Sequence, residues 1–358
     1  ITGLGLSEPL RKYLDQHPEY TSVFYDVAGG NSRRALKEHG DKFKGFWPFN
    51  NWEEFVSRTW VFPDEVWKEI ENKVLEAMGE ASAVRITDPE GTYLEWPLTA
   101  EEARRWQMTA FISGHLLMHP LHSTSGERQV ASSLEVPPVL PDLNGVLAGT
   151  ANHCGFFPRI EVYFEHGRMV DVKGGGRYGD GIRDMMEKYQ NVHWPVYPDK
   201  GYFWFCDCAL CTAVKAFRRT SDMFSSYWVY PNFAERTRAG VLHMGFGSRR
   251  HGEDFRRYVE EHDLPTGHIH VHNYFATFEV KLQGTHYWQK IIDKGWLTAM
   301  DEPDIRALAT KYGVPDELLR YDWIPPLPGI NCEGNYAEDY APNPIAFLKK
   351  RIEHNQPI

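Results

Sequence analysis

The spacing of apolar residues changes near residue 80 and divides the chain into two parts. Over residues 65–81, apolar side chains recur three or four positions apart, which predicts a helix with one buried stripe. The apolar run at residues 21–28 is followed by two glycines, which predicts a strand and a turn. From residue 82 onward, apolar and polar residues alternate in short segments, which is typical of strands with one buried face.

Turn-forming residues join several of these predicted strands as hairpins. The turns are DPEG at 88–91, EHG at 165–167 and DKG at 293–295. Helical spacing predicts further helices over residues 181–190, 253–262, 302–313 and 345–355. The glycine-rich segment GGGRYGDG at 174–181 lacks the lysine and hydroxyl residue of a phosphate-binding loop, so we interpret it as a flexible loop, with a phosphate-binding loop as the weaker alternative.

These elements predict a mixed α/β (α+β) fold organised in three parts. Residues 1–81 form an N-terminal α/β lobe, and residues 82–320 form a mainly β catalytic domain with flanking helices. Residues 321–358 form a proline-rich C-terminal tail that contains a short helix. We expect the functional site in the second part, where strands dominate.

Composition and charge narrow the class of protein. With 42% hydrophobic and 25% charged residues, the 358-residue chain is typical of soluble globular proteins. A net charge of −10 argues against a nucleic-acid surface, and no apolar run approaches the length of a membrane span. The first residues lack a signal-peptide pattern and the five cysteines do not suggest a disulfide framework, so we expect a cytoplasmic protein. Tryptophan-rich and proline-rich segments favour a homo-oligomer.

The segment GHIHVHNYF at 267–275 carries three histidines at alternate positions, His268, His270 and His272. On a strand, neighbours two positions apart share a face at roughly 6.5–7 Å, which allows two imidazoles to bind one ion. Positions four apart are roughly 13 Å apart, so His268 and His272 cannot share a metal with ordinary rotamers. The alternative is a half-exposed strand whose histidines bind nothing.

A third ligand must come from elsewhere in the chain, and His243 is the best candidate. It follows an apolar strand-like segment and precedes two glycines that allow close backbone approach. His251, Glu253 and Asp254 lie just beyond, and one of those carboxylates could complete an iron site of two histidines and one carboxylate.

Several segments occur in an order that resembles a known superfamily. They are VRITDPEGTYLEW, SLEVPP, RIEVYFEHGRMVDVKGGG, LHMGFGS, GHIHVHNYF, VKLQGTHYW and IIDKGWL. Together they resemble the thermophilic metallo-aminopeptidase superfamily, and within it the 2,5-dihydroxypyridine 5,6-dioxygenases. The resemblance covers roughly residues 80–297. It implies a mononuclear site of His243, His268 and His270, with His270 at a position where the dioxygenases have aspartate. The short stretch between His243 and His268 argues against a two-metal peptidase.

The resemblance implies a non-haem Fe(II) dioxygenase that opens a hydroxylated aromatic or N-heteroaromatic ring with O₂. Candidate acid and base groups are His272, His286 and Tyr287. Trp288, Tyr274 and Phe275 are candidates to stack a small aromatic substrate, or are equally core residues. Three neutral histidines also suit Zn or Mn, so the alternative is a hydrolase of an amide, amine or small peptide. A non-enzymatic protein with structural histidines is the third hypothesis.

Cys206, Cys208 and Cys211 lie within one short segment, FCDCALC. Their spacing matches neither a paired zinc motif nor a standard iron–sulfur motif. We interpret them as small buried apolar side chains, with a structural zinc site as the alternative.

Overall fold

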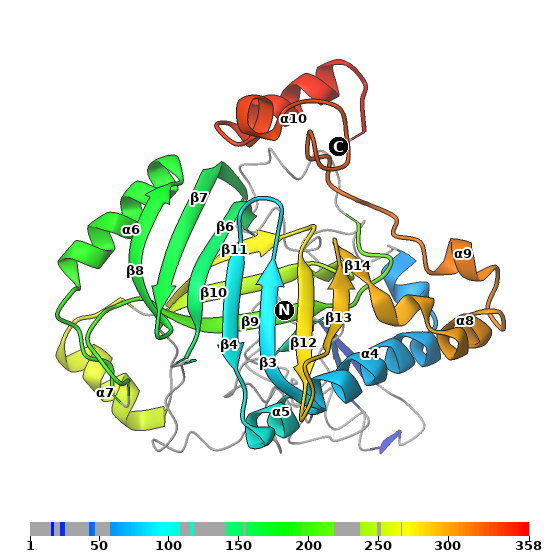
Figure 1. The fold of residues 1–358 in the computed structure, drawn as a ribbon, viewed down its shortest axis with the longest axis horizontal. Helices are drawn as coiled ribbons and strands as arrows, with labels where there is room; N and C mark the ends of the chain where they lie inside the picture. The colour runs from blue at the N-terminus through cyan, green and yellow to red at the C-terminus, as the bar shows by residue number, and fades with distance from the viewer. Residues whose placement is uncertain are drawn as a thin grey trace.

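A large, strongly curled antiparallel sheet organises the computed structural model of the chain (Figure 1). The structure describes residues 16–17, 22–25, 43–46, 58–107, 115–117, 140, 142–152, 155–195, 197–217, 237–248, 252–265 and 267–357. A second, two-stranded sheet pairs β1 (Ser22–Tyr25) with β2 (Phe43–Phe46) in parallel. The mixture of helices with a curled sheet confirms the predicted mixed fold class.

The large sheet has twelve strands in the order β11-β10-β9-β8-β7-β6-β4-β3-β12-β13-β14, with β5 paired to β9. Their bounds are β3 (Ala81–Thr87), β4 (Tyr93–Pro97), β5 (His115–Leu117), β6 (Asn144–Asn152), β7 (Gly155–Glu165), β8 (Arg168–Gly174), β9 (Trp204–Cys211), β10 (Leu242–Ser248), β11 (Gly267–Asn273), β12 (Thr277–Leu282), β13 (Trp288–Asp293) and β14 (Trp296–Leu297). The three predicted hairpin turns are confirmed, because they join β3 to β4, β7 to β8 and β13 to β14.

Helices flank this sheet. Their bounds are η2 (Arg58–Val61), α4 (Asp64–Gly79), α5 (Ala100–Gln107), α6 (Gly176–Lys188), α7 (Gly252–Glu261), η5 (Thr298–Asp301), α8 (Pro303–Ala309), α9 (Pro315–Leu318), the π-helical turn η6 (Tyr336–Tyr340) and α10 (Pro344–Glu353). The five predicted helices are therefore present as α4, α6, α7, α8 and α10. Of the described helices, none combines the length and apolar character needed to cross a membrane.

The glycine-rich segment at 174–181 is not a flexible loop, and this interpretation was wrong. Gly174, Gly175 and Gly176 have positive φ angles, and α6 begins at Gly176. A Cβ on Gly179 would lie 2.0 Å from the carbonyl oxygen of Gly174, so glycine lets the first turn of α6 press against the end of β8. Glycine has low helix propensity, which is why the sequence favoured a loop.

The curl of the sheet brings β11 back against β6. Figure 1 shows the two strands in the same region, and a Cβ on Gly149 of β6 would lie only 2.6 Å from Cγ1 of Val271. The Asn273 side chain donates a 2.7 Å hydrogen bond to the carbonyl oxygen of Ala148. Strands β6 to β11 therefore wrap around one apolar core, which includes the side chains of Phe164 and Phe246.

The C-terminal segment covers one end of the curled sheet (Figure 1). Trp323, Leu327 and Tyr340 form a second apolar core there with residues at the ends of strands, such as Tyr274. At the other end of the chain, the buried face of α4 belongs to the same core as β3 and β12. The predicted boundaries at residues 81 and 320 stay predictions, because much of the first part lies outside the described residues.

Candidate functional site

Four histidines lie on one face of the β10–β11 pair, and we call them the histidine row: His243, His268, His270 and His272. The antiparallel register sets His243 opposite His272, Gly245 opposite His270 and Gly247 opposite His268. Residues directly opposite each other in an antiparallel pair point to the same face. The other face of these strands carries Leu242, Met244, Phe246 and Val271, which belong to the main core.

Gly247 of β10 lets the backbone of β11 approach closely. A Cβ on Gly247 would lie 2.7 Å from Cα of His268, and Gly247 has a φ of +152°. A larger residue would therefore be strained and would also collide with β11. The sequence predicted close backbone approach at the glycines after His243, and at Gly247 the approaching segment is the histidine strand itself.

The imidazoles of the histidine row contact each other in sequence. Ring centroids lie 4.4 Å apart for His268 and His270, 4.0 Å for His270 and His243, and 4.9 Å for His243 and His272. Nδ1 of His243 and Nε2 of His272 are 2.9 Å apart, which is a hydrogen bond in which one nitrogen carries the proton. Of the four, His243, His270 and His272 are buried and His268 is half-buried.

This spacing suits two ligands of one metal ion. Two nitrogens bonded to an ion at about 2.0–2.1 Å are roughly 3 Å apart when they occupy neighbouring positions. The donors are imidazoles, which suit Zn and Fe. Within the described part of the chain, no three His, Cys, Asp or Glu side chains already converge as a complete metal site. The pair His243–His272 thus has the spacing of two ligands once its shared proton is lost, and the tilted ring of His270 lies beside it.

The register bears on which histidine could be the third ligand. His243 lies beside His272, so the backbone of His268 is four strand positions away, at roughly 13 Å. His268 is therefore about as far from His243 along the strands as it is from His272. His270 contacts His243 directly and has no such obstacle.

The three other candidates near residue 287 lie in a different hairpin. His286 and Tyr287 are exposed in the turn between β12 and β13, and the Tyr287 side chain is 63% exposed. Trp288 begins β13, and the guanidinium carbon of Arg85 lies 3.9 Å from its ring centroid.

Tyr274 and Phe275 directly follow the histidine strand and pack into the second apolar core. Tyr274 is fully buried and meets the Trp323 ring edge-on, with centroids 6.2 Å apart. Phe275 is partly buried against the same core. Both positions are explained by packing. The alternative carboxylate ligands stay open, because His251 and the side chains of Glu253 and Asp254 lie outside the described residues.

The cysteines of FCDCALC lie on β9 and are buried. Cys208 packs in the main core, whereas Cys211 packs in the second core on the other side of the sheet. Side chains that face opposite sides of a strand cannot bind one ion together. The structure therefore does not bring Cys206, Cys208 and Cys211 into one site, and their packing agrees with the apolar interpretation.

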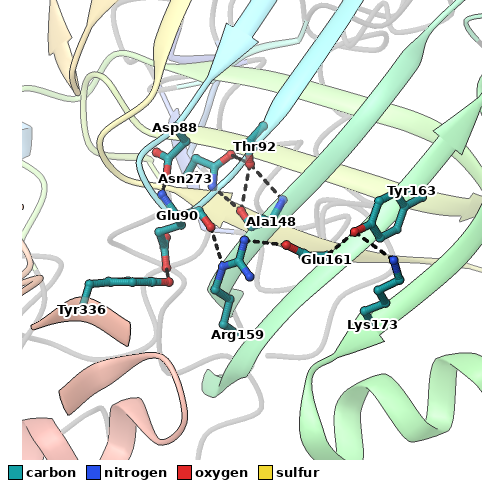
Figure 2. A network of polar contacts seen from close by, with 10 residues as sticks. All are labelled: Asp88, Glu90, Thr92, Ala148, Arg159, Glu161, Tyr163, Lys173, Asn273 and Tyr336. Atoms are coloured by element: carbon teal, nitrogen blue, oxygen red, sulfur yellow. Dashed lines mark hydrogen bonds and ion pairs between the residues drawn. The ribbon is translucent and has the colours of Figure 1, made fainter. Parts of the chain in front are cut away.

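A second polar centre, which sequence reasoning missed, lies at the β3–β4 turn (Figure 2). We call it the carboxylate turn, and it consists of Asp88 and Glu90 with the groups that bind them. Asp88 accepts a hydrogen bond from the Glu90 amide at 2.8 Å, and Asp88 also accepts one from the Phe275 amide at 3.3 Å. The hydroxyls of Thr150 and Tyr336 each donate to Oε1 of Glu90 at 2.7 Å.

Arg159 of β7 joins the turn to the sheet surface. Its Nε donates to the backbone carbonyl of Glu90 at 2.5 Å, and its Nη2 forms an ion pair with Glu161 at 2.8 Å. Tyr163 donates to the second oxygen of Glu161 at 2.7 Å (Figure 2). The guanidinium therefore lies between a buried backbone carbonyl and a half-buried carboxylate.

Burial controls the protonation of the carboxylate turn. Desolvation raises the pKa of Asp88, and this effect outweighs the hydrogen bonds from the Glu90 and Phe275 amides, which lower the pKa. Desolvation and then the charge of Asp88 raise the pKa of Glu90, against hydrogen bonds from Tyr336 and Thr150. Burial and the neighbouring Glu90 raise the pKa of Tyr336, so its hydroxyl keeps its proton. The sequence signal was only DPEG, which marks a turn and says nothing of burial.

Comparisons with known proteins yield neighbours in fold. Neither a family model nor a curated protein matches the chain. Among solved structures, a 2,5-dihydroxypyridine dioxygenase from Pseudomonas putida KT2440 aligns with a TM-score of 0.46 and 11% identity, over 77% of this chain and 70% of that one. Wild-type AmpT from Thermus thermophilus aligns with a TM-score of 0.37 and 15% identity, over 75% of this chain and 69% of that one. Likeness at these identities and TM-scores carries no argument about the activity of this chain.

Proposed function

We propose that this chain is a metal-dependent enzyme whose histidine row binds one Fe(II) ion. The enzyme is then a dioxygenase that opens a hydroxylated aromatic or N-heteroaromatic ring. The observation that carries the metal proposal is the buried pair His243–His272, whose nitrogens are 2.9 Å apart. The dioxygenase activity rests on the sequence resemblance described above.

His243 and His270 are the two ligands common to every arrangement we consider. The register favours His272 as the third ligand, whereas the sequence resemblance implied His268. If His272 is the third ligand, the half-buried His268 is the member of the row with access to solvent. It is then the histidine best placed to exchange a proton with a substrate.

Fe(II) held by three imidazoles would supply open coordination positions for a hydroxylated ring and O₂. A ring-opening dioxygenase breaks one ring bond and adds both oxygen atoms of O₂ to the product, so no other reductant is needed. The protein would contribute ligand geometry and a site from which water is excluded. The burial of three of the four imidazoles is consistent with such exclusion.

The hydrolase is kept as the second candidate because the row contains only neutral ligands. Three imidazoles with one open position resemble a zinc centre that activates water. A zinc or manganese hydrolase would act on an amide, amine or small peptide without consuming O₂.

The test combines metal analysis with oxygen uptake. Protein purified anaerobically is loaded separately with Fe(II), Zn(II) or Mn(II), and metal per chain is measured by mass spectrometry. O₂ uptake is then followed with catechol, gentisate and 2,5-dihydroxypyridine as probes. We expect one Fe per chain and uptake of one O₂ per ring opened.

Tight Zn binding with turnover of amide substrates that does not depend on O₂ would establish the hydrolase instead. Absence of metal binding would overturn both.

A further inference from the structure

The strand that carries His268, His270 and His272 lies at the end of the sheet. Among the described strands, β11 forms its ladder with β10. Its other edge faces β6, since a Cβ on Gly149 would lie 3.3 Å from the carbonyl oxygen of His272. An edge strand carries backbone groups that its ladder does not satisfy. The placement of the three histidines therefore depends on what holds this edge.

Two side chains from other elements hold the edge of β11. The hydroxyl of Tyr178 in α6 donates a 3.1 Å hydrogen bond to the carbonyl oxygen of His270. Three residues further along, the side-chain amide of Asn273 donates to the carbonyl oxygen of Ala148 in β6 at 2.7 Å. The segment from His270 to Asn273, which includes His272, is thus fixed near both ends by side-chain hydrogen bonds in place of a second ladder.

This arrangement accounts for the close contact of the imidazoles. In an antiparallel pair, residues whose backbone groups point away from the partner strand form the closely spaced pairs, with Cα atoms roughly 4.5 Å apart instead of 5.5 Å. The carbonyl oxygens of His270 and His272 are reached from the edge that faces away from β10. We therefore place His243 and His272 in a closely spaced pair, which agrees with the 2.9 Å between their ring nitrogens.

The Tyr178 side chain is itself held by rigid elements. The Tyr178 amide donates to the carbonyl oxygen of Gly175 at 3.1 Å, and Gly179 presses the first turn of α6 against Gly174 at the end of β8. The Tyr178 ring stacks on Phe157 of β7, with centroids 4.4 Å apart and an angle of 26° between the planes. The glycine-rich segment at 174–181 thus places the phenol hydroxyl at the edge of β11.

We propose that Tyr178 is a positioning residue for the histidine row: its hydroxyl fixes β11 at His270 and so sets the spacing of the imidazoles that bind the metal. The hydroxyl bonds to the backbone, so it acts through the strand. His270 is a ligand in every arrangement considered above, so the effect is the same whether His268 or His272 is the third ligand. The consequence for metal binding rests on the proposed function, whereas the effect on β11 does not.

The first test is amide hydrogen exchange of β11 in the metal-free full chain, followed by mass spectrometry. Tyr178→Phe removes the hydroxyl and keeps the ring that stacks on Phe157. We expect the amides of β11 to exchange about fivefold faster in this variant, the factor that corresponds to the loss of one typical hydrogen bond. Exchange as slow as in the original chain would overturn the proposal.

Thr298→Val is the matched control. The half-buried Thr298 hydroxyl also donates to strand carbonyl oxygens, those of Lys290 at 2.8 Å and Ile291 at 3.0 Å in β13, toward the opposite end of the sheet. This variant loses a hydrogen bond of the same kind and should leave the exchange of β11 unchanged. If Thr298→Val accelerates β11 as much as Tyr178→Phe does, the effect is a general loss of stability and the proposal is wrong.

The second test is titration of the same folded variants with Co(II). The titration measures affinity, and the visible absorption of the bound ion reports the arrangement of its ligands. We expect Tyr178→Phe to bind Co(II) about tenfold more weakly and with a shifted absorption band, as when a group that orients a ligand is removed. Thr298→Val should match the original chain in both measurements. Unchanged affinity and absorption in Tyr178→Phe would overturn the proposal.

Tyr178→Leu removes the ring as well and separates packing from hydrogen bonding. If Tyr178→Phe behaves like the original chain and only Tyr178→Leu differs, packing on Phe157 explains the effect and the proposal is wrong. If the original chain binds no Co(II), the proposed function fails, whereas amide exchange in the metal-free chain still decides the role of the hydroxyl.

Discussion

The histidine row and the carboxylate turn are both buried polar centres, but they are assembled in different ways. The row comes from two strands that are neighbours in the sheet, and three of its four members alternate along a single strand. The carboxylate turn combines residues 88–90 with Thr150, Arg159 and Tyr336, which are far apart in the chain. Local periodicity can reveal the first kind of centre, whereas only long-range packing creates the second.

The two centres also differ in how burial is tolerated. Neutral imidazoles can be buried in contact with one another, since one ring donates and its neighbour accepts. Two adjacent carboxylates cannot both stay charged away from water, and their raised pKa values reflect this cost. The row can therefore be buried without charge, whereas the turn is buried by keeping protons on its carboxyl groups.

The strongest test of the row compares His272→Ala with His268→Ala. If the register decides the ligand set, His272→Ala should lower metal affinity at least 100-fold, because it removes a direct ligand. His268→Ala should change the affinity less than tenfold. Metal content after dialysis against a graded chelator series measures both. The exposed His262, outside the row, provides the control variant His262→Ala. The reverse order of effects would restore the ligand set implied by the sequence resemblance.

A backbone test examines how the row is accommodated. Gly247→Ala introduces a Cβ 2.7 Å from Cα of His268, whereas Gly267→Ala has a similar φ, +127°, and open space around the new atom. Both variants carry conformational strain, but only the first carries the collision. We expect the free energy of unfolding of Gly247→Ala to be about 2 kcal/mol lower than that of Gly267→Ala. Denaturant titration measures the difference, and equal stabilities would show that β10 and β11 do not approach so closely.

The carboxylate turn is tested by the pH dependence of stability. The pKa of Glu90 in the folded protein is raised above its ordinary 4.5. Protonated Glu90 therefore contributes fully to the free energy of unfolding below pH 4.5, and this contribution is lost as the pH rises through the folded pKa. Glu90→Gln should remove this decrease in the free energy of unfolding, which amounts to at most about 1.4 kcal/mol per pH unit.

Glu161→Gln is the matched comparison because the sign is opposite. A hydrogen bond from Tyr163 lowers the pKa of Glu161, so its contribution is present above 4.5 and is lost as the pH falls through the folded value. The two variants should therefore change the slope of unfolding free energy against pH in opposite directions and in different pH ranges. Parallel changes would show that Glu90 is not buried as described.

The fold class, three hairpins and five helices could be predicted because each depends on a local pattern. Apolar spacing identified α4, and turn residues identified the β3–β4 connection. The start of α6 could not be predicted, because glycines 174, 175, 176 and 179 have low helix propensity and Gly179 is in close contact with the end of β8. Tyr274 and Phe275 could not be assigned between substrate binding and packing, because the C-terminal segment that covers them lies some 50 residues further along the chain.

By itself, the sequence determined that His268, His270 and His272 share one face of a strand, because side chains alternate along any extended backbone. Only the tertiary structure decided that His243 lies beside His272 rather than His268, because the strand register depends on the packing of the whole sheet. Only the tertiary structure, likewise, buried Asp88 and Glu90. A turn with two acids is normally solvated, and it becomes a polar centre here because β6, β7 and the C-terminal segment enclose it.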